Sequence, residues 1–242
     1  MTVFRLGRDL VFPHPDYADP DGLLALGGDL SPRRLILAYS WGIFPWYSKG
    51  EPILWWSPDP RLVIFPEKIK ISKSLKRVIK KGVFRVSMDE AFSQVVRSCA
   101  ETRLQKGIGT WITPEMVEAY EKLHNLGYAH SVETWYGDEL VGGLYGVSLG
   151  LAFFGESMFS RMADASKIAL VFLAKTLQLW GFKIIDCQVT TDHLIRMGAE
   201  EIPRRTFLEI LRQIVSHPHK KGSWQRDFES SLNAVEPLLK GC

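Results

Sequence analysis

The chain has 242 residues, of which 46% are hydrophobic and 24% are charged, with a net charge of +3. This length predicts one large domain or two modest ones, with enough chain to bury a core without disulfides. The charged fraction excludes a chain that is disordered throughout. Three cysteines without a CxxC pair exclude a disulfide framework and a cysteine-rich zinc site, and they favour a reducing compartment.

No segment of the sequence is suited to a membrane. The longest uninterrupted apolar run, residues 168–174, is far shorter than the ~20 residues that span a bilayer. The opening residues MTVFRLGRDL lack the apolar stretch of a secretory signal peptide. We therefore expect a cytoplasmic protein with no membrane partner.

The first 62 residues are rich in proline, glycine and tryptophan. A helix is predicted over residues 31–39, because Ser31 can cap it and Pro32 suits its first turn. The prolines of the next segment, IFPWYSKGEPILWWSPDP, prevent a regular helix and predict an ordered, aromatic-packed loop or hairpin. Its tryptophans Trp46, Trp55 and Trp56 either build a small core or provide rings on which bases stack.

A strongly basic segment follows. Residues 68–88 contain eight lysines and arginines and no acidic residue, whereas the rest of the chain is net acidic. Within it, SKSLKRVIKK predicts a short helix whose cations share one face. They are Lys73, Lys76, Arg77, Lys80 and Lys81. Like charges at this spacing repel unless a polyanion neutralises them, so the face is either solvated or a contact for nucleic acid.

Two helices are expected next. Ser87 and Glu90 have the spacing of a capping box for a helix that runs to Cys99. Thr113-Pro114 is typical of the start of a second helix, which Gly127 ends.

The remaining residues predict one α/β unit. Three strands are expected over residues 130–136, 139–148 and 151–156, with Gly142-Gly143 marking a bulge or a close backbone approach. A polar loop, SMFSRMAD, then precedes an apolar helix over 166–180, a strand over 183–189 and a helix over 205–215. A meander, a buried helix and a further strand is the order of the acetyltransferase-like fold, so the predicted class is α/β (α+β).

Polar side chains interrupt two of the apolar strands. Asp186 and Gln188 alternate with apolar residues and point the same way, and Glu156 ends another strand. A carboxylate inside an apolar strand is costly to bury unpaired, so these three residues predict a polar cluster in a cleft. The cluster is either catalytic or binding, or it is a structural network with Arg161 or Lys167.

Other chemistries lack support in the sequence. The six histidines have no metal-ligand spacing, and neither a nucleophile elbow nor a phosphate-binding loop occurs. Cys187 has no obvious histidine partner and is expected to be a packed thiol.

The chain contains four long motifs, GLLALGGDLSPRRLILAYSWGIFPWYSKGEPILWWSPDPR (22–61), TWITPEMVEAY (110–120), FGESMFSRMADASK (154–167) and IIDCQVTTDHLIRMGAEEIPRR (184–205). Together they resemble the bacterial leucyl/phenylalanyl-tRNA–protein transferases. The resemblance extends from about residue 12 to about residue 211. It implies a small N-terminal subdomain, residues 1–62, joined to an acetyltransferase-like (GNAT-like) catalytic domain, residues 63–242.

The resemblance also implies a function. Leucine or phenylalanine, and also methionine, would pass from aminoacyl-tRNA to proteins that begin with arginine or lysine, which marks them for N-end-rule degradation. The resemblance further implies a monomer that uses no cofactor and no metal.

The family's site residues carry over to matching positions. By resemblance, Glu156, Asp186 and Gln188 correspond to the active-site trio, and Trp46 and Trp111 to the aromatic wall around the terminal adenosine. The cations of residues 73–81 would contact acceptor-stem phosphates. The pocket for the transferred side chain would be lined by Phe153, Met158, Leu170 and Ile185.

Two proton-transfer schemes remain open. In one, Asp186 draws the proton from the acceptor amine through Gln188. In the other, a ribose hydroxyl of the tRNA shuttles the proton while Glu156 and Gln188 orient the acceptor.

Two other functions remain as alternatives. One is an acetyl-CoA-dependent N-acetyltransferase, although ESMFSRMADASK lacks the glycines of a pyrophosphate loop. The other is a non-catalytic tRNA-binding module.

Overall fold

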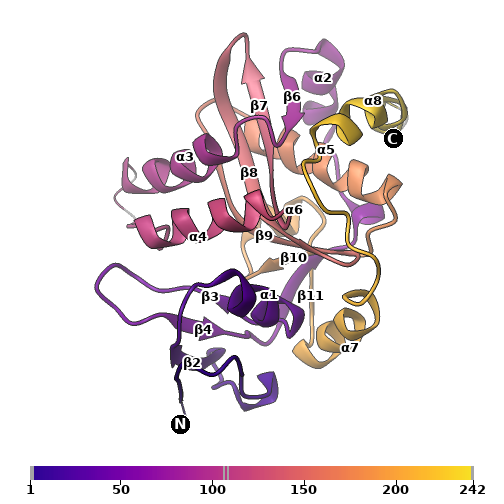
Figure 1. Ribbon diagram of the computed structural model, residues 1–242. Helices are drawn as coiled ribbons and strands as arrows, with labels where there is room; N and C mark the ends of the chain where they lie inside the picture. The colour runs from indigo at the N-terminus through magenta and orange to yellow at the C-terminus, as the bar shows by residue number, and fades with distance from the viewer. Residues whose placement is uncertain (1–2, 106, 108, 241–242) are drawn as a thin grey trace.

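The computed structural model describes residues 3–105, 107 and 109–240. Within them the strands form a four-stranded sheet, β1-β2-β4-β3, and a seven-stranded sheet, β11-β5-β10-β9-β8-β7-β6 (Figure 1). The strands are β1 Phe4–Leu6, β2 Leu23–Gly27, β3 Phe44–Pro45, β4 Leu54–Trp56, β5 Arg61–Ile64, β6 Arg85–Met88, β7 Ala129–Tyr136, β8 Glu139–Leu149, β9 Ala152–Ser160, β10 Ile184–Gln188 and β11 Glu200–Ile202. The helices are α1 Pro32–Ser40, α2 Lys73–Lys81, α3 Phe92–Gln105, α4 Pro114–Asn125, α5 Ala165–Leu179, α6 Asp192–Arg196, α7 Arg204–Ile214 and α8 Gln225–Lys240, with 3₁₀ turns at Pro15–Tyr17 and Pro66–Lys68.

The N-terminal sheet confirms the predicted helix and hairpin. Ser31 Oγ accepts the Arg34 N–H at the start of α1. The proline-rich segment folds back as a hairpin of β3 and β4. Trp55 is buried in the core, as one of the two alternatives predicts, whereas Trp46 keeps 38% of its surface exposed.

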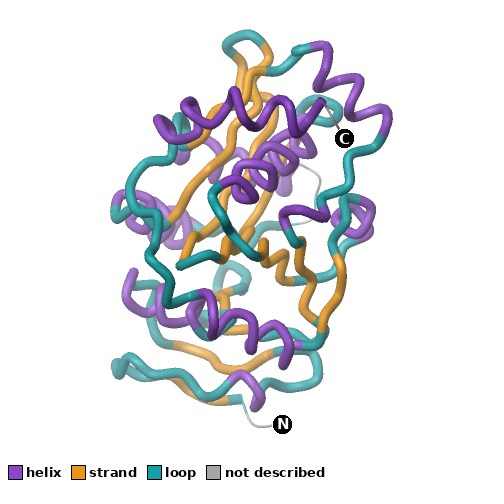
Figure 2. The backbone as a smooth tube through the Cα atoms, turned by 90° about the vertical axis from the view of Figure 1, so that its right-hand side faces the viewer, coloured by secondary structure: helices purple, strands orange, loops and turns teal. Residues whose placement is uncertain are grey.

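The seven-stranded sheet lies between two helical layers (Figures 1 and 2). Val95 of α3 and Met116 of α4 belong to the core on one face, and Ile168 of α5 belongs to the core on the other. β7, β8 and β9 form the expected antiparallel meander, and α5 is the crossover to β10, which runs parallel to β9. The predicted α/β (α+β) class and acetyltransferase-like order are therefore confirmed.

The Gly142-Gly143 pair has the expected role of permitting a close approach. A Cβ atom on Gly142 would lie 2.5 Å from the Ala165 Cβ, at the start of α5. The register between β7 and β8 also shifts between Thr134 and Trp135, opposite this pair. Glycine thus brings α5 directly onto the middle of the sheet.

The predicted capping box before α3 is wrong. Ser87 lies within strand β6 and donates to Glu133 Oε2 at 2.6 Å, while Glu90 forms an ion pair with Arg85. The free Ala91 N–H at the start of α3 donates to Glu133 Oε1 instead. A carboxylate from strand β7 therefore replaces the local cap.

The polar loop expected after residue 156 is shorter than predicted. Residues 157–160 continue strand β9, which pairs with β8 as far as Ser160. The strands β1, β2, β5, β6 and β11 and the helices α6 and α8 were not predicted. Ser157 and Ser160 explain the misassigned loop, because serine is common in loops and its pairing partner on β8 is not visible in the local sequence.

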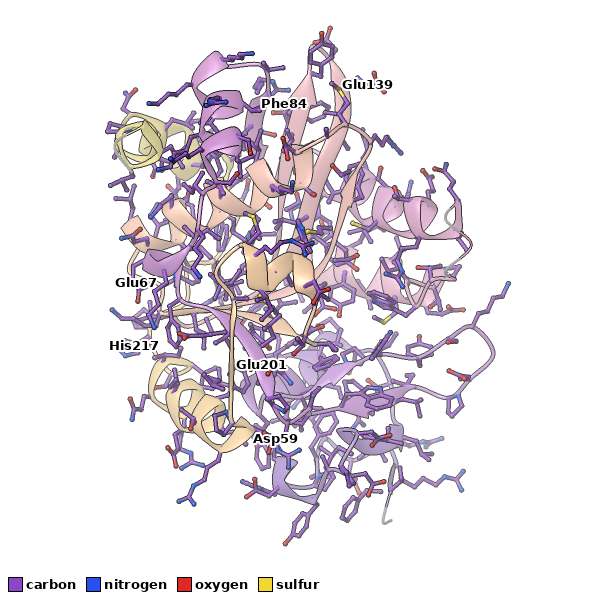
Figure 3. The ribbon with its side chains drawn as sticks, turned by 180° about the vertical axis from the view of Figure 1, so that it is seen from behind. Asp59, Glu67, Phe84, Glu139, Glu201 and His217 are labelled. Atoms are coloured by element: carbon purple, nitrogen blue, oxygen red, sulfur yellow. The ribbon has the colours of Figure 1, made fainter. Side chains whose placement is uncertain are left out.

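The chain passes from the first sheet to the second between Trp56 and Arg61. Tyr39 of α1 and Tyr120 of α4 nevertheless belong to the same core, so the division at residue 62 stays a prediction. Seen from behind, Phe84 and Glu139 lie at one end of the larger sheet and Asp59 lies towards the other (Figure 3). None of the described helices has both the length and the apolar character needed to cross a bilayer.

Candidate active site

Strands β9 and β10 separate after a short parallel pairing. The described ladder runs from Ala152 with Ile184 to Phe154 with Asp186. Beyond it, β10 has an irregular register against β5, and Gln188 takes a left-handed φ of 63°. A cavity of about 460 Å³ is lined by the residues of both strands that follow this point.

One part of the cavity is apolar and the other is aromatic. Leu170 and Leu173 of α5 contribute to it, together with Leu194 of α6. Trp46 and Trp111 lie with their ring centroids 5.7 Å apart and their planes at 76°. The structure brings together all six predicted substrate-binding residues, Trp46, Trp111, Phe153, Met158, Leu170 and Ile185.

Glu156 occupies the polar end of the cavity, where three neutral groups donate to its carboxyl. The Tyr39 hydroxyl lies 2.7 Å from Oε1, the Tyr120 hydroxyl 2.6 Å from Oε2, and Gln188 Nε2 2.7 Å from Oε1. Burial raises the pKa of Glu156 to about 7, although these hydrogen bonds lower it. Burial also raises the pKa values of Tyr39 and Tyr120 well above 10, so both hydroxyls stay protonated donors.

Asp186 lies behind the cavity and is absent from its described lining. Its two oxygens accept from Arg61 Nε at 2.7 Å and Nη2 at 2.6 Å, and both side chains are fully buried. Asp186 Oδ1 also accepts the Gln188 N–H at 2.9 Å. The Arg61 guanidinium lies over the rings of Phe44 and Phe207, at 4.8 and 4.7 Å from their centroids.

Glu156, Asp186 and Gln188 are therefore connected by hydrogen bonds, but Asp186 does not face the cavity with the other two. Gln188 joins them, since its backbone N–H bonds to Asp186 and its side chain to Glu156. Arg161 and Lys167, the expected structural partners, pair instead with Glu101 and Asp164. The partner of Asp186 is Arg61.

The basic helix α2 lies apart from the cavity lining. Lys73, Lys80 and Lys81 are exposed on its surface, and the helix is anchored by Leu75, which is buried. None of the five predicted tRNA-binding cations is among the described residues that line the cavity. Any contact that α2 makes with a substrate is separate from the pocket.

The cavity lining also contains a thiol. Cys187 lines the cavity, but burial raises its pKa well above that of a free thiol. Among the described residues no group of three or more His, Cys, Asp or Glu side chains is arranged to hold a metal ion. The turn between β9 and α5, residues 161–164, contains no glycine.

Sequence reasoning missed four residues of the site: Tyr39, Arg61, Arg103 and Tyr120. Helical periodicity placed Tyr39 and Tyr120 inward but did not show that both meet Glu156. Arg61 follows a proline-rich segment and carries no local signal. Arg103 lines the cavity from the end of α3, in a segment without recognisable motifs.

The chain is similar to proteins of one family. The family model described as leucyl/phenylalanyl-tRNA protein transferase matches residues 63–212, and the model for the N-terminal domain of that family matches residues 28–59. The leucyl/phenylalanyl-tRNA–protein transferase of Thermodesulfovibrio yellowstonii is 57% identical over 98% of this chain and 97% of its own length. The protein of the same name from Syntrophobacter fumaroxidans is 59% identical over 93% and 96%.

A solved structure with a limited likeness is an aminoglycoside acetyltransferase from an uncultured soil sample. It is 14% identical, covers 48% of this chain and 84% of its own, and has a TM-score of 0.38. This overlap is too small to characterise the cavity.

Proposed function

Because this chain belongs to the leucyl/phenylalanyl-tRNA–protein transferase family, we propose that its cavity holds the aminoacyl end of a tRNA during transfer. The enzyme is an aminoacyltransferase that uses aminoacyl-tRNA. The transferred residue is leucine, phenylalanine or methionine, and the acceptor is a protein that begins with arginine or lysine. The observation that carries this proposal is the joining of an apolar pocket, two tryptophans and a buried carboxyl in one cavity.

The apolar part of the cavity suits an unbranched, apolar side chain. Phe153, Leu170 and Ile185 provide no charge or hydrogen-bonding group there. A shape-based preference is limited, since one methylene contributes only ~1–3 kcal/mol to discrimination. The pocket therefore accepts several apolar amino acids rather than one.

The reaction needs little acid–base assistance. The acceptor nitrogen bonds to the ester carbonyl carbon, the bond from that carbon to the ribose oxygen breaks, and a proton passes from nitrogen to that oxygen. An α-amino group has a pKa of roughly 7.7–8.0, so a useful fraction is neutral. Holding amine and ester together can contribute ~7–11 kcal/mol towards lowering the barrier. Positioning therefore supplies most of the catalysis.

The contacts of Asp186 favour the substrate-assisted scheme. Its carboxylate bonds to Arg61 and to the Gln188 backbone, whereas the Gln188 side chain bonds to Glu156. Asp186 is then a positioning residue, and a ribose hydroxyl carries the proton. Asp186→Asn keeps an oxygen for the Gln188 N–H but removes the base. We expect a loss of only a few-fold in single-turnover rate, whereas a general base would contribute ~10²–10⁴-fold.

The charged groups of the chain fit both of its proposed substrates. The Glu156 carboxyl favours a cationic acceptor terminus by charge complementarity, and the α2 cations would contact tRNA phosphates. We expect a monomer in the cytoplasm, because aminoacyl-tRNA is made in that compartment. The products of transfer would enter N-end-rule degradation.

The test is transfer from labelled Phe-tRNA to proteins that begin with arginine, lysine or alanine. Label should reach the first two and not the third, and prior RNase digestion should abolish it. Label on the alanine acceptor would contradict the acceptor specificity. Acetylation from acetyl-CoA that is insensitive to RNase, or tRNA binding without transfer, would replace the proposed activity with one of the two alternatives.

A further inference from the structure

Arg103 contributes a cation to the wall of the cavity. It lies in the last turn of α3, and its guanidinium is 3.9 Å from the centroid of the Trp111 ring. Its Nε donates to Gly109 O at 3.3 Å. The guanidinium itself is therefore held over an aromatic ring, at a site that the cavity reaches.

No described carboxylate lies within 4.0 Å of the Arg103 guanidinium, whereas two nearby arginines form ion pairs. Arg97 on the same helix pairs with Glu121 at 3.2 Å, and Arg161 pairs with Glu101 at 3.3 Å. Arg103 is only half-buried, and an arginine keeps its charge in proteins. This charge is left uncompensated beside the cavity.

The charge of Arg103 points to an anion on the tRNA side of the cavity. Glu156 already accepts three hydrogen bonds, and the only other ionisable side chains of the described lining are those of Cys187, Tyr145 and His193. Burial lowers the pKa of His193, so it adds no cation at neutral pH. The cationic acceptor terminus, which we place next to Glu156, cannot be the group that compensates the charge of Arg103. A guanidinium next to two tryptophans suits a phosphate that is joined to a stacked base.

We propose that Arg103 binds the phosphodiester between the last two nucleotides of the tRNA, while Trp46 and Trp111 hold the terminal adenosine. This assignment rests on the proposed function, because it requires the tRNA end to occupy the cavity. It gives the enzyme a contact with the nucleic acid at the active site itself, separate from α2.

The test compares two non-reactive ligands in which phenylalanine is linked by an amide bond. One is the adenosine derivative, which has no phosphodiester, and the other is the cytidylyl-adenosine derivative, which has one. Calorimetry gives the dissociation constant of each for the full-length wild type and for Arg103→Met, which keeps an unbranched side chain but removes the charge. Arg97→Met is the matched control, because Arg97 lies on the same helix but does not line the cavity.

The wild type and Arg97→Met should bind the dinucleotide about 10-fold more tightly than the nucleoside, as expected for a hydrogen-bonded charge pair. Arg103→Met should lose this advantage and bind the nucleoside within twofold of the wild type. Arg103→Lys should keep part of it. For the dinucleotide, the slope of log affinity against log salt should fall by ~0.7 in Arg103→Met.

Two results would overturn the assignment. In the first, the wild type binds both ligands with equal affinity. In the second, Arg103→Met lowers the affinity for both ligands by the same factor, as expected if Arg103 only supports Trp111. Failure of the proposed function is recognised differently, since the wild type would then transfer no label from intact Phe-tRNA.

Discussion

Glu156 is a buried carboxyl whose three hydrogen-bond donors are all uncharged. Such donors stabilise the carboxylate less than a cation does, so burial prevails and the pKa rises to about 7. The group therefore changes its charge close to physiological pH. Its ionisation is linked to the stability of the fold.

The free energy of unfolding should decrease as pH rises through this range. An unfolded chain releases the Glu156 proton near the ordinary 4.5, whereas the folded protein holds it up to about 7. Between these values the folded state binds the extra proton, so the contribution of this group falls by about 3 kcal/mol and is then constant. Urea unfolding at about pH 5 and pH 8 should show a smaller decrease for Glu156→Gln than for the wild type. Equal decreases would show that the carboxyl ionises normally.

At the residue scale, chemistry that depends on strand alternation could be predicted. The polar cluster of Glu156, Asp186 and Gln188 follows from carboxyl and amide groups placed in apolar strands. The ion pair with Arg61 could not be predicted, because it joins residues 125 positions apart through the pairing of β5 with β10. That register depends on tertiary packing, which a local pattern does not specify.

Helix α2 is an amphipathic element whose apolar residues Leu75, Val78 and Ile79 pack in or against the core that α5 helps to form. Ser72 Oγ accepts the Leu75 N–H at its start, and Gly82 ends it in the left-handed region with a φ of 61°. Leu75 is its buried residue. Five cations within nine residues repel one another, which a bound polyanion would relieve.

Removing charge from α2 should weaken tRNA binding without altering the pocket. The variant Lys73→Gln/Lys80→Gln/Lys81→Gln should reduce the salt slope by up to ~0.9 for each lost phosphate contact. Filter binding of Phe-tRNA over a range of salt concentrations measures this slope. The rate of transfer from phenylalanyl-adenosine should stay within twofold of the wild type. An equal loss with that minimal substrate would place these lysines in the active site.

At the element scale, helices whose signals are local were predicted well. α1 and α4 begin at the serine or threonine and proline that the sequence provides. The start of α3 was misassigned, because its cap is Glu133 from another strand. α8 has apolar residues at helical spacing, Phe228, Leu232, Val235 and Leu239, so that signal was present and was overlooked.

The C-terminal segment is anchored to the rest of the fold by Trp224. This ring is fully buried and stacks on His130, with centroids 3.7 Å apart and planes at 6°. Its backbone N–H donates to Asp89 Oδ2 at 2.7 Å, and the same oxygen lies 2.9 Å from His130 Nδ1. α8 continues from this anchor and packs beside α5 (Figure 1).

Trp224→Ala should destabilise the whole fold. Loss of a buried tryptophan typically costs about 3–5 kcal/mol, or roughly 6–20 °C in Tm at this chain length. Differential scanning calorimetry measures the shift. Trp41→Ala is the control, because Trp41 is 41% exposed and its loss should cost less than ~1 kcal/mol. Similar shifts for both variants would contradict the anchoring role of Trp224.

The left-handed backbone of Gln188 places two opposing demands on one position. An L-residue pays about 1–2 kcal/mol for that conformation, which glycine adopts freely, yet glycine cannot donate to Glu156 as Gln188 does. Glycine at position 188 would therefore relieve the backbone strain only by giving up the buried hydrogen bond to Glu156, and it would erode transfer. Selection for stability and transfer together should retain glutamine and accumulate its stabilising changes elsewhere.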